Sequence, residues 1–101
     1  MNKQHLNYEI SAFFEKHGLV KTNIGHETVF KLNNAVYRFS EENDFATLEC
    51  ARSAEEAKLN MYEDISAYNL KSMSEQQAEN LVKSDILEYI ILPASASLKS
   101  A

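Results

Sequence analysis

The sequence predicts a single α+β domain in which helices pack on one face of an antiparallel sheet. Two segments, near the two chain ends, show the three- and four-residue spacing of apolar side chains that is typical of amphipathic helices. Between them, residues 19–52 mix β-branched and aromatic residues with polar ones and contain turn signals. The chain has 101 residues, 45% of them hydrophobic, which is enough for one core and too few for two. This order of elements favours a two-layer domain.

Residues 2–17 are expected to form the N-terminal helix. Gly18 follows at the place where a left-handed residue ends a helix, and Leu19 is positioned to fold back onto the last turn. One face of this helix is expected to lie against the core, and its side chains are Leu6, Ile10, Phe13, Phe14 and His17.

The middle of the chain is expected to form an antiparallel meander. Asn33-Asn34 suits a two-residue hairpin turn, because asparagine tolerates a positive φ, and this turn pairs Phe30 with Tyr37. A second turn at Glu42-Asn43 pairs Tyr37 with Leu48. The two turns therefore predict three strands, and the segment before them adds a fourth strand or a lead-in.

Both registers place the same apolar side chains on one face of the sheet, which favours the meander. These side chains are Phe30, Leu32, Ala35, Tyr37, Phe39, Ala46, Leu48 and Cys50. The opposite, outer face is mixed, with Val29, Val36 and Phe45 beside charged residues. A mixed face is usually solvated, and it also suits half of a dimer interface. Arg38 lies in the middle of this face, where we expect it to pair with a neighbouring glutamate.

Helical signals return after residue 52. Ser53 and Glu56 have the spacing of a capping box, which predicts a short helix that runs to near Met61 or Tyr62 and buries Met61. Residues 63–72 show no clear period and are expected to be irregular.

A second capping box, from Ser74 to Gln77, begins the long C-terminal helix. This helix is expected over residues 75–92 and is ended by Pro93. A strand over residues 86–92 is the alternative, but continuity with the preceding helical pattern favours a helix. The short and long helices are expected to pack with the first helix on one sheet face. The domain then spans residues 1–93 and is followed by a flexible Ser/Ala-rich tail, residues 94–101.

Composition argues against several classes of function. Acidic residues outnumber basic ones 15 to 10, and the net charge of −5 disfavours direct binding of nucleic acid. The sequence has neither a signal-peptide pattern nor an apolar run near the ~20 residues of a membrane span. The single cysteine, Cys50, cannot form an internal disulfide, which is typical of a reducing compartment. We therefore expect a cytoplasmic protein.

Patterns for catalysis and metal binding are missing from the sequence. The histidines, His5, His17 and His26, have spacings that match no metal motif. Cys50 falls on the predicted core face, where it suits a small buried hydrophobe better than a nucleophile. The expectation is a protein without catalytic residues, metal or cofactor.

Acidic residues gather around the short helix in the second half of the chain. They form two adjacent pairs, Glu55 with Glu56 and Glu63 with Asp64. The ordinary interpretation is a solvated helix end with its caps. The alternative is a negative patch that docks a basic partner, with Tyr62 and Tyr68 as aromatic anchors.

Residues 46–57 and 61–65 form an acidic passage from strand to helix and beyond. In type, size and charge, a chain with this passage resembles the immunity proteins of bacterial toxin–immunity pairs, including contact-dependent inhibition and polymorphic-toxin systems. The resemblance implies a non-enzymatic inhibitor that blocks a toxin domain, often a basic nuclease, by direct binding. It makes Glu55, Glu56, Glu63 and Asp64 the expected contact.

The sequence also fits two other functions. One is a self-associating accessory or regulatory domain that dimerises through the outer sheet face. The other is an α+β domain that binds a small molecule in a pocket between the sheet and the helices.

Overall fold

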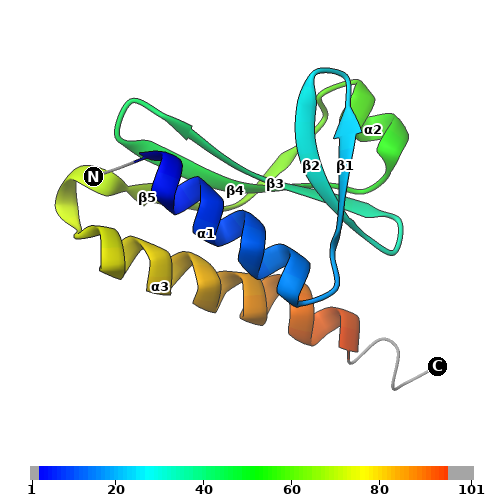
Figure 1. Ribbon diagram of the computed structural model, residues 1–101. Helices are drawn as coiled ribbons and strands as arrows, with labels where there is room; N and C mark the ends of the chain where they lie inside the picture. The colour runs from blue at the N-terminus through cyan, green and yellow to red at the C-terminus, as the bar shows by residue number, and fades with distance from the viewer. Residues whose placement is uncertain (1–2, 96–101) are drawn as a thin grey trace.

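A computed structural model describes residues 3–95 of the chain, and it confirms the α+β class. Five strands form one antiparallel sheet in sequence order, with long helices on one face and a short helix on the other (Figure 1). The elements are α1 (Lys3–Lys16), β1 (Val20–Ile24), β2 (Glu27–Leu32), β3 (Ala35–Glu42), β4 (Phe45–Ala51), α2 (Ala54–Lys58), β5 (Glu63–Asn69), the 3₁₀ turn η1 (Leu70–Ser72), α3 (Glu75–Ile86) and the π-helical turn η2 (Leu87–Ile91).

The main core lies between the sheet and the pair α1 and α3. Phe14 of α1 stacks on Phe30 of β2, with ring centroids 4.8 Å apart. The side chains of this core are Leu6, Ile10, Phe14, Leu19, Phe30, Ala46, Leu48, Tyr68, Leu70, Ala78, Val82, Ile86 and Ile90. The predicted face of α1 is therefore confirmed for its aliphatic residues and Phe14.

The end of α1 follows the prediction closely. Gly18 has a φ of +89°, and its N–H donates to the carbonyl of Glu15. The N–H of Leu19 reaches back to the carbonyl of Phe14 at 3.1 Å, which completes a Schellman motif. Leu19 is buried, so the hydrophobic contact that usually accompanies this motif is present.

The first hairpin has the predicted register, with Phe30 opposite Tyr37. The second turn lies one residue later than predicted, at Asn43 and Asp44, which have φ of +52° and +54°. Positive φ at both central residues is what a tight hairpin needs, and Asn-Asp meets that need better than Glu-Asn. The shift moves the partner of Tyr37 from Leu48 to Cys50 and leaves every side chain on its predicted face.

The segment that was expected to be irregular contains β5. The register between β4 and β5 shifts between Leu48 and Glu49, so β5 has an irregularity in its N-terminal half. Because of it, both Ile65 and Tyr68 reach the main core although they are three residues apart. This spacing hides the two-residue period of a strand from the sequence.

The short helix α2 lies on the outer face of the sheet, which corrects the expectation that all helices share one face (Figure 1). Its Ala57 packs with Val29, Val36 and Ala51 in a second, smaller core. Val29 and Val36 are apolar residues of the mixed outer face. Their burial under α2 stabilises the fold.

The C-terminal helix begins as predicted, and Ser74 and Gln77 form both hydrogen bonds of a capping box. It does not end at Pro93, since residues 92–95 are helical. The N–H of Leu92 donates to the carbonyl of Leu87, five residues earlier, and this wider π turn leaves room for the proline ring. Of the predicted tail, residues 94 and 95 belong to the helix, and residues 96–101 lie outside the described residues.

Candidate protein-binding site

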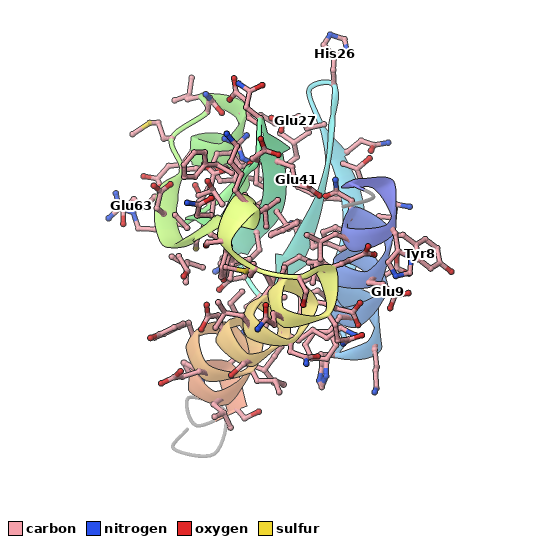
Figure 2. The ribbon with its side chains drawn as sticks, turned by 90° about the vertical axis from the view of Figure 1, so that its left-hand side faces the viewer. Tyr8, Glu9, His26, Glu27, Glu41 and Glu63 are labelled. Carbon is pink, nitrogen blue, oxygen red and sulfur yellow. The ribbon has the colours of Figure 1, made fainter. Side chains whose placement is uncertain are left out.

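Five of the six predicted contact residues gather where α2 leads into β5. Glu55 and Glu56 lie in the first turn of α2, Tyr62 lies in the connection, and Glu63 and Asp64 begin β5. Glu63 lies at the periphery of the molecule (Figure 2). These residues lie close together because they are close in sequence, which is why the sequence alone could predict them as one group.

Tyr68 is not part of this surface. Its side chain is 2% exposed, and its hydroxyl donates to a carboxylate oxygen of Asp85 on α3 at 2.7 Å. Burial, and then the negative charge of Asp85, raise the pKa of the Tyr68 hydroxyl. The expectation that Tyr68 anchors a partner is therefore wrong, because this ring links β5 to α3 inside the core.

Tyr62 is half-buried and is fixed by an ion-pair network on the outer sheet face. The guanidinium carbon of Arg38 lies 3.7 Å from the centre of the Tyr62 ring. Arg38 donates to Glu49 at 3.0 Å and to Glu27 at 2.8 Å, which confirms the predicted pairing. The pKa of the Tyr62 hydroxyl is raised, mainly by burial. The stacked Arg38 and the partial burial therefore restrain the Tyr62 side chain, which lies beside the acidic residues.

The sequence missed two apolar side chains of this surface, Leu59 and Met61. Leu59 is 71% exposed and Met61 is 52% exposed. Asn60 between them has a φ of +58° and ends α2 with a second Schellman motif, in which the N–H of Met61 donates to the carbonyl of Glu56 at 2.9 Å. Met61 was expected to be buried because the helix was expected to continue to it. Asparagine in the left-handed position was the signal that the helix ends earlier.

The two Schellman motifs of the chain differ in one respect. After α1 the apolar residue that follows the left-handed position, Leu19, is buried in the main core. In α2 the equivalent residue, Met61, points to solvent. The turn at Asn60 therefore holds Leu59 and Met61 in a fixed place without burying them. We call Glu55, Glu56, Leu59, Met61, Tyr62, Glu63 and Asp64 together the α2–β5 surface; all are exposed except Glu56 and Tyr62, which are half-buried.

The electrostatic character of the α2–β5 surface is acidic. Among the described residues, Glu56 is the only one of its four acids that forms an ion pair, with Arg52 at 2.9 Å. The hydrogen bonds from Arg52 lower the pKa of the Glu56 carboxyl, so the carboxylate stays ionised. A hollow of about 220 Å³ is lined by Met61 and Tyr62 together with Cys50, Arg52, Glu56 and Glu63. This small hollow suits one side chain of a partner.

Cys50 is one of the residues that line this hollow, and it is half-buried. Burial raises the pKa of its thiol, and the nearby acids Glu63 and Glu56 act in the same direction, against a hydrogen bond with Tyr37. Burial also raises the pKa of Tyr37 to about 12. A thiol with a raised pKa is held protonated at neutral pH, which is the opposite of what a nucleophilic cysteine needs.

A second hollow, of about 420 Å³, separates the C-terminal end of the helical layer from the β2–β3 turn. Cys50, Tyr37 and Tyr89 are among its lining residues. Within residues 3–95, no group of three or more metal-ligating side chains is close enough to hold an ion. His26, for example, projects from the tip of the β1–β2 turn (Figure 2).

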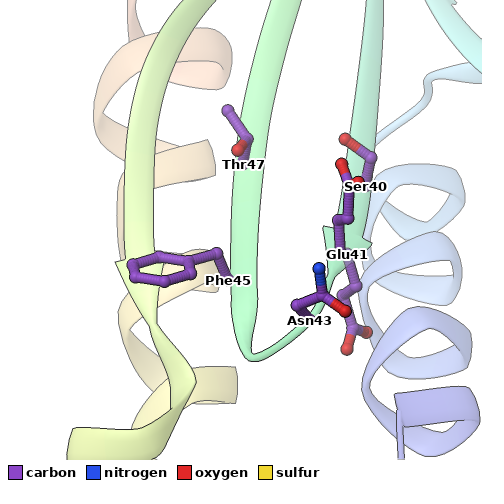
Figure 3. Close-up of a pocket in the computed structure, with 6 residues that line it drawn as sticks. Ser40, Glu41, Asn43, Phe45 and Thr47 are labelled. Carbon is purple, nitrogen blue, oxygen red and sulfur yellow. The ribbon is translucent and has the colours of Figure 1, made fainter.

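The outer sheet face is largely closed at the end that α2 covers. The hypothesis of a dimer through this face rests on Val29, Val36 and Phe45, and the two valines are fully buried within the chain. Phe45 is 56% exposed and remains open at the other end, beside a hollow that Ser40 and Thr47 also line (Figure 3). Among the three apolar residues of the hypothesis, Phe45 is therefore the one that is open to a partner.

No family model, curated protein or solved structure shows significant similarity to the chain. None of the helices in the described part of the chain is long and apolar enough to cross a membrane.

Proposed function

We propose that this chain is a non-enzymatic binding protein of the immunity type, which neutralises a basic toxin domain by direct binding. The α2–β5 surface is the proposed contact. The observation that supports it best is the exposure of Leu59 and Met61 on a rigid turn among carboxylates. Central apolar residues with a charged rim are typical of protein-binding sites.

The apolar pair would provide much of the binding free energy. Full burial of a leucine or methionine side chain contributes about 1.5–3 kcal/mol. Leu59 and Met61 are 71% and 52% exposed, so covering both should contribute roughly 2–4 kcal/mol in total. The turn is already fixed by backbone hydrogen bonds, which reduces the entropy lost on binding.

The carboxylates would select a basic partner and speed its capture. Glu55, Glu63 and Asp64 make no ion pair within the described residues, and the whole chain has a net charge of −5. Attraction between an acidic surface and a basic one raises the association rate and falls with ionic strength. A basic toxin domain, such as a nuclease, fits this surface. We place this action in the cytoplasm of a bacterium, where a single unpaired cysteine is compatible with the reducing conditions.

The proposal can be tested by a selection for toxin fragments. A genomic fragment library from the source organism is expressed with and without this chain. The expected result is a fragment that encodes a basic domain, that is lethal alone and that is tolerated when the chain is present.

The same selection identifies the binding surface. Leu59→Asp with Met61→Asp should abolish rescue, because it places charge in the apolar centre of the contact. Leu81→Asp is the matched control, since Leu81 is 44% exposed on α3, away from the α2–β5 surface, and it should rescue like the wild type. The proposal fails if no fragment depends on the chain for tolerance, and its surface is wrong if the double variant still rescues.

A further inference from the structure

β5 is an edge strand of the sheet. The strand order places β1 at one edge and β5 at the other, so β4 is the only strand beside β5 in the described part of the chain. Proteins commonly protect such edges with lysine, proline or bulges. β1 has the exposed Lys21, whereas β5 contains neither lysine, arginine nor proline between Glu63 and Asn69. Its irregularity lies in the N-terminal half and leaves Ser66 to Asn69 regular.

In this regular half of β5, some backbone N–H and C=O groups point away from β4. In an antiparallel ladder, the N–H and C=O groups of successive residues point alternately to the two sides. The two-residue turn before β4 sets this alternation. The backbone N–H and C=O groups of Tyr68 therefore point toward those of its partner Ala46, and the backbone groups of Ser66 point toward those of Leu48. Ala67 lies between them and therefore offers its N–H and C=O to a further strand.

The side chains near Ala67 allow another strand to approach. Ala67 is small and exposed, and it lies opposite Thr47 on the outer face. Phe45 begins β4, and its partner in the register is Asn69 near the end of β5. Because Phe45 is 56% exposed, a strand added at β5 can cover apolar surface as well as form backbone hydrogen bonds.

Charges at the two ends of β5 are of opposite sign. Glu63 and Asp64 begin the strand, and Lys71 follows its C-terminal end. The side chain of Lys71 is 74% exposed, and its only ion pair in the described residues is a long one, 3.8 Å to Asp44. An antiparallel copy of the same strand, centred on Ala67, brings the acidic start of each β5 near the η1 turn of the other copy, which carries Lys71. The pairing is then complementary at both ends.

We propose that β5 pairs with β5 of a second copy of this chain, antiparallel and centred on Ala67, so that the two sheets become one. The interface is isologous, since the same strand contributes from both copies. This inference shares Glu63 with the α2–β5 surface, but it does not rest on the proposed function. The turn with Leu59 and Met61 precedes β5, so the two copies of the α2–β5 surface lie at opposite ends of the joined strands.

The test is the mass of the purified full chain in solution, measured by light scattering and by sedimentation over a range of concentrations without any partner. The expected mass is twice the 11.5 kDa of one chain. Ala67→Pro removes an outward N–H and leaves the hydrogen bonds between β4 and β5 intact, so it should yield a monomer. Lys21→Pro is the matched control at the opposite edge and should remain a dimer.

A charge exchange tests the register. Glu63→Lys or Lys71→Glu alone places like charges together at two symmetric positions and should weaken dimerisation on the order of tenfold. The double variant restores both pairs and should recover the wild-type dissociation constant. A second copy is the wrong occupant if the wild-type chain is monomeric at millimolar concentration. A dimer that tolerates Ala67→Pro, or double-variant dimerisation as weak as that of the single variants, would disprove this interface. These measurements do not involve a toxin, so their failure is distinct from failure of the proposed function.

Discussion

Replacing Tyr68 by phenylalanine is expected to destabilise the fold by about 1.5 kcal/mol. The substitution keeps the buried ring and removes only the hydroxyl that donates to Asp85 at 2.7 Å. A hydrogen bond to a charged group contributes about 1.5–3 kcal/mol. Asp85 is half-buried, so water can replace part of the lost contact and the lower end of that range applies. For a domain of this size the melting temperature should fall by roughly 6–10 °C.

The assay is urea denaturation followed by circular dichroism, for Tyr68→Phe, Asp85→Asn and the double variant. The two single changes should not be additive, and the coupling free energy should be about 1 kcal/mol. A coupling near zero, or a Tyr68→Phe variant as stable as the wild type, would refute the view that this bond ties β5 to α3.

The raised pKa values of two tyrosine hydroxyls, those of Tyr37 and Tyr68, predict how the free energy of unfolding changes at alkaline pH. Burial raises the pKa of Tyr68, and it raises that of Tyr37 from 10.0 to about 12. Between pH 10 and pH 12 the unfolded chain loses these protons and the folded chain keeps them, so the free energy of unfolding falls as pH rises. Below pH 10 both states are protonated and the contribution is fully present. Tyr37→Phe should reduce the slope above pH 10, which denaturation at a series of pH values can measure.

Three further predictions concern the core, a helix end and the outer face. Leu48→Ala should cost about 2–5 kcal/mol of unfolding free energy in thermal or urea melts, because Leu48 is fully buried and leaves a cavity; a loss below 1 kcal/mol would contradict the core assignment. Gly18→Ala should cost about 1–2 kcal/mol by the same measurement, since the φ of +89° is strained for alanine although its Cβ would meet no atom within 4 Å; unchanged stability would argue against the left-handed cap. Arg38→Met should destabilise by about 1–3 kcal/mol because it leaves Glu49, 13% exposed, without its cation, and adding Glu49→Met should restore most of that loss; no recovery in the double variant would show that the stack on Tyr62, rather than the ion pair, matters.

Local patterns in the sequence predicted the parts of the fold that depend on neighbouring residues. The end of α1 followed from Gly18 and Leu19, and the first hairpin followed from Asn33-Asn34. The faces of β3 and β4 survived an error in the second turn, because a slip by two residues does not change which side chains point inward.

The missed features depend on contacts between segments or on an interrupted period. β5 was missed because its irregularity lets Ile65 and Tyr68 reach the same core. The side on which α2 packs could not be read from its own residues, since it depends on the apolar patch of Val29 and Val36 across the sheet. For the candidate site, the acidic residues were visible as a cluster in the sequence. The exposure of Leu59 and Met61 depended on where one short helix ends.

The sheet order bears on how the chain folds. Each strand pairs with the strand that precedes or follows it. Tight turns join the strands from β1 to β4, and the longer connection through α2 adds β5, so the sheet can grow from contacts between neighbouring segments. The contact between α1 and α3 joins the two ends of the described chain, and it is the pairing that requires the longest loop to close. We expect the meander to form first and the helical layer to close over it last. In the interval before closure, the apolar face of the sheet is open to water and to other chains.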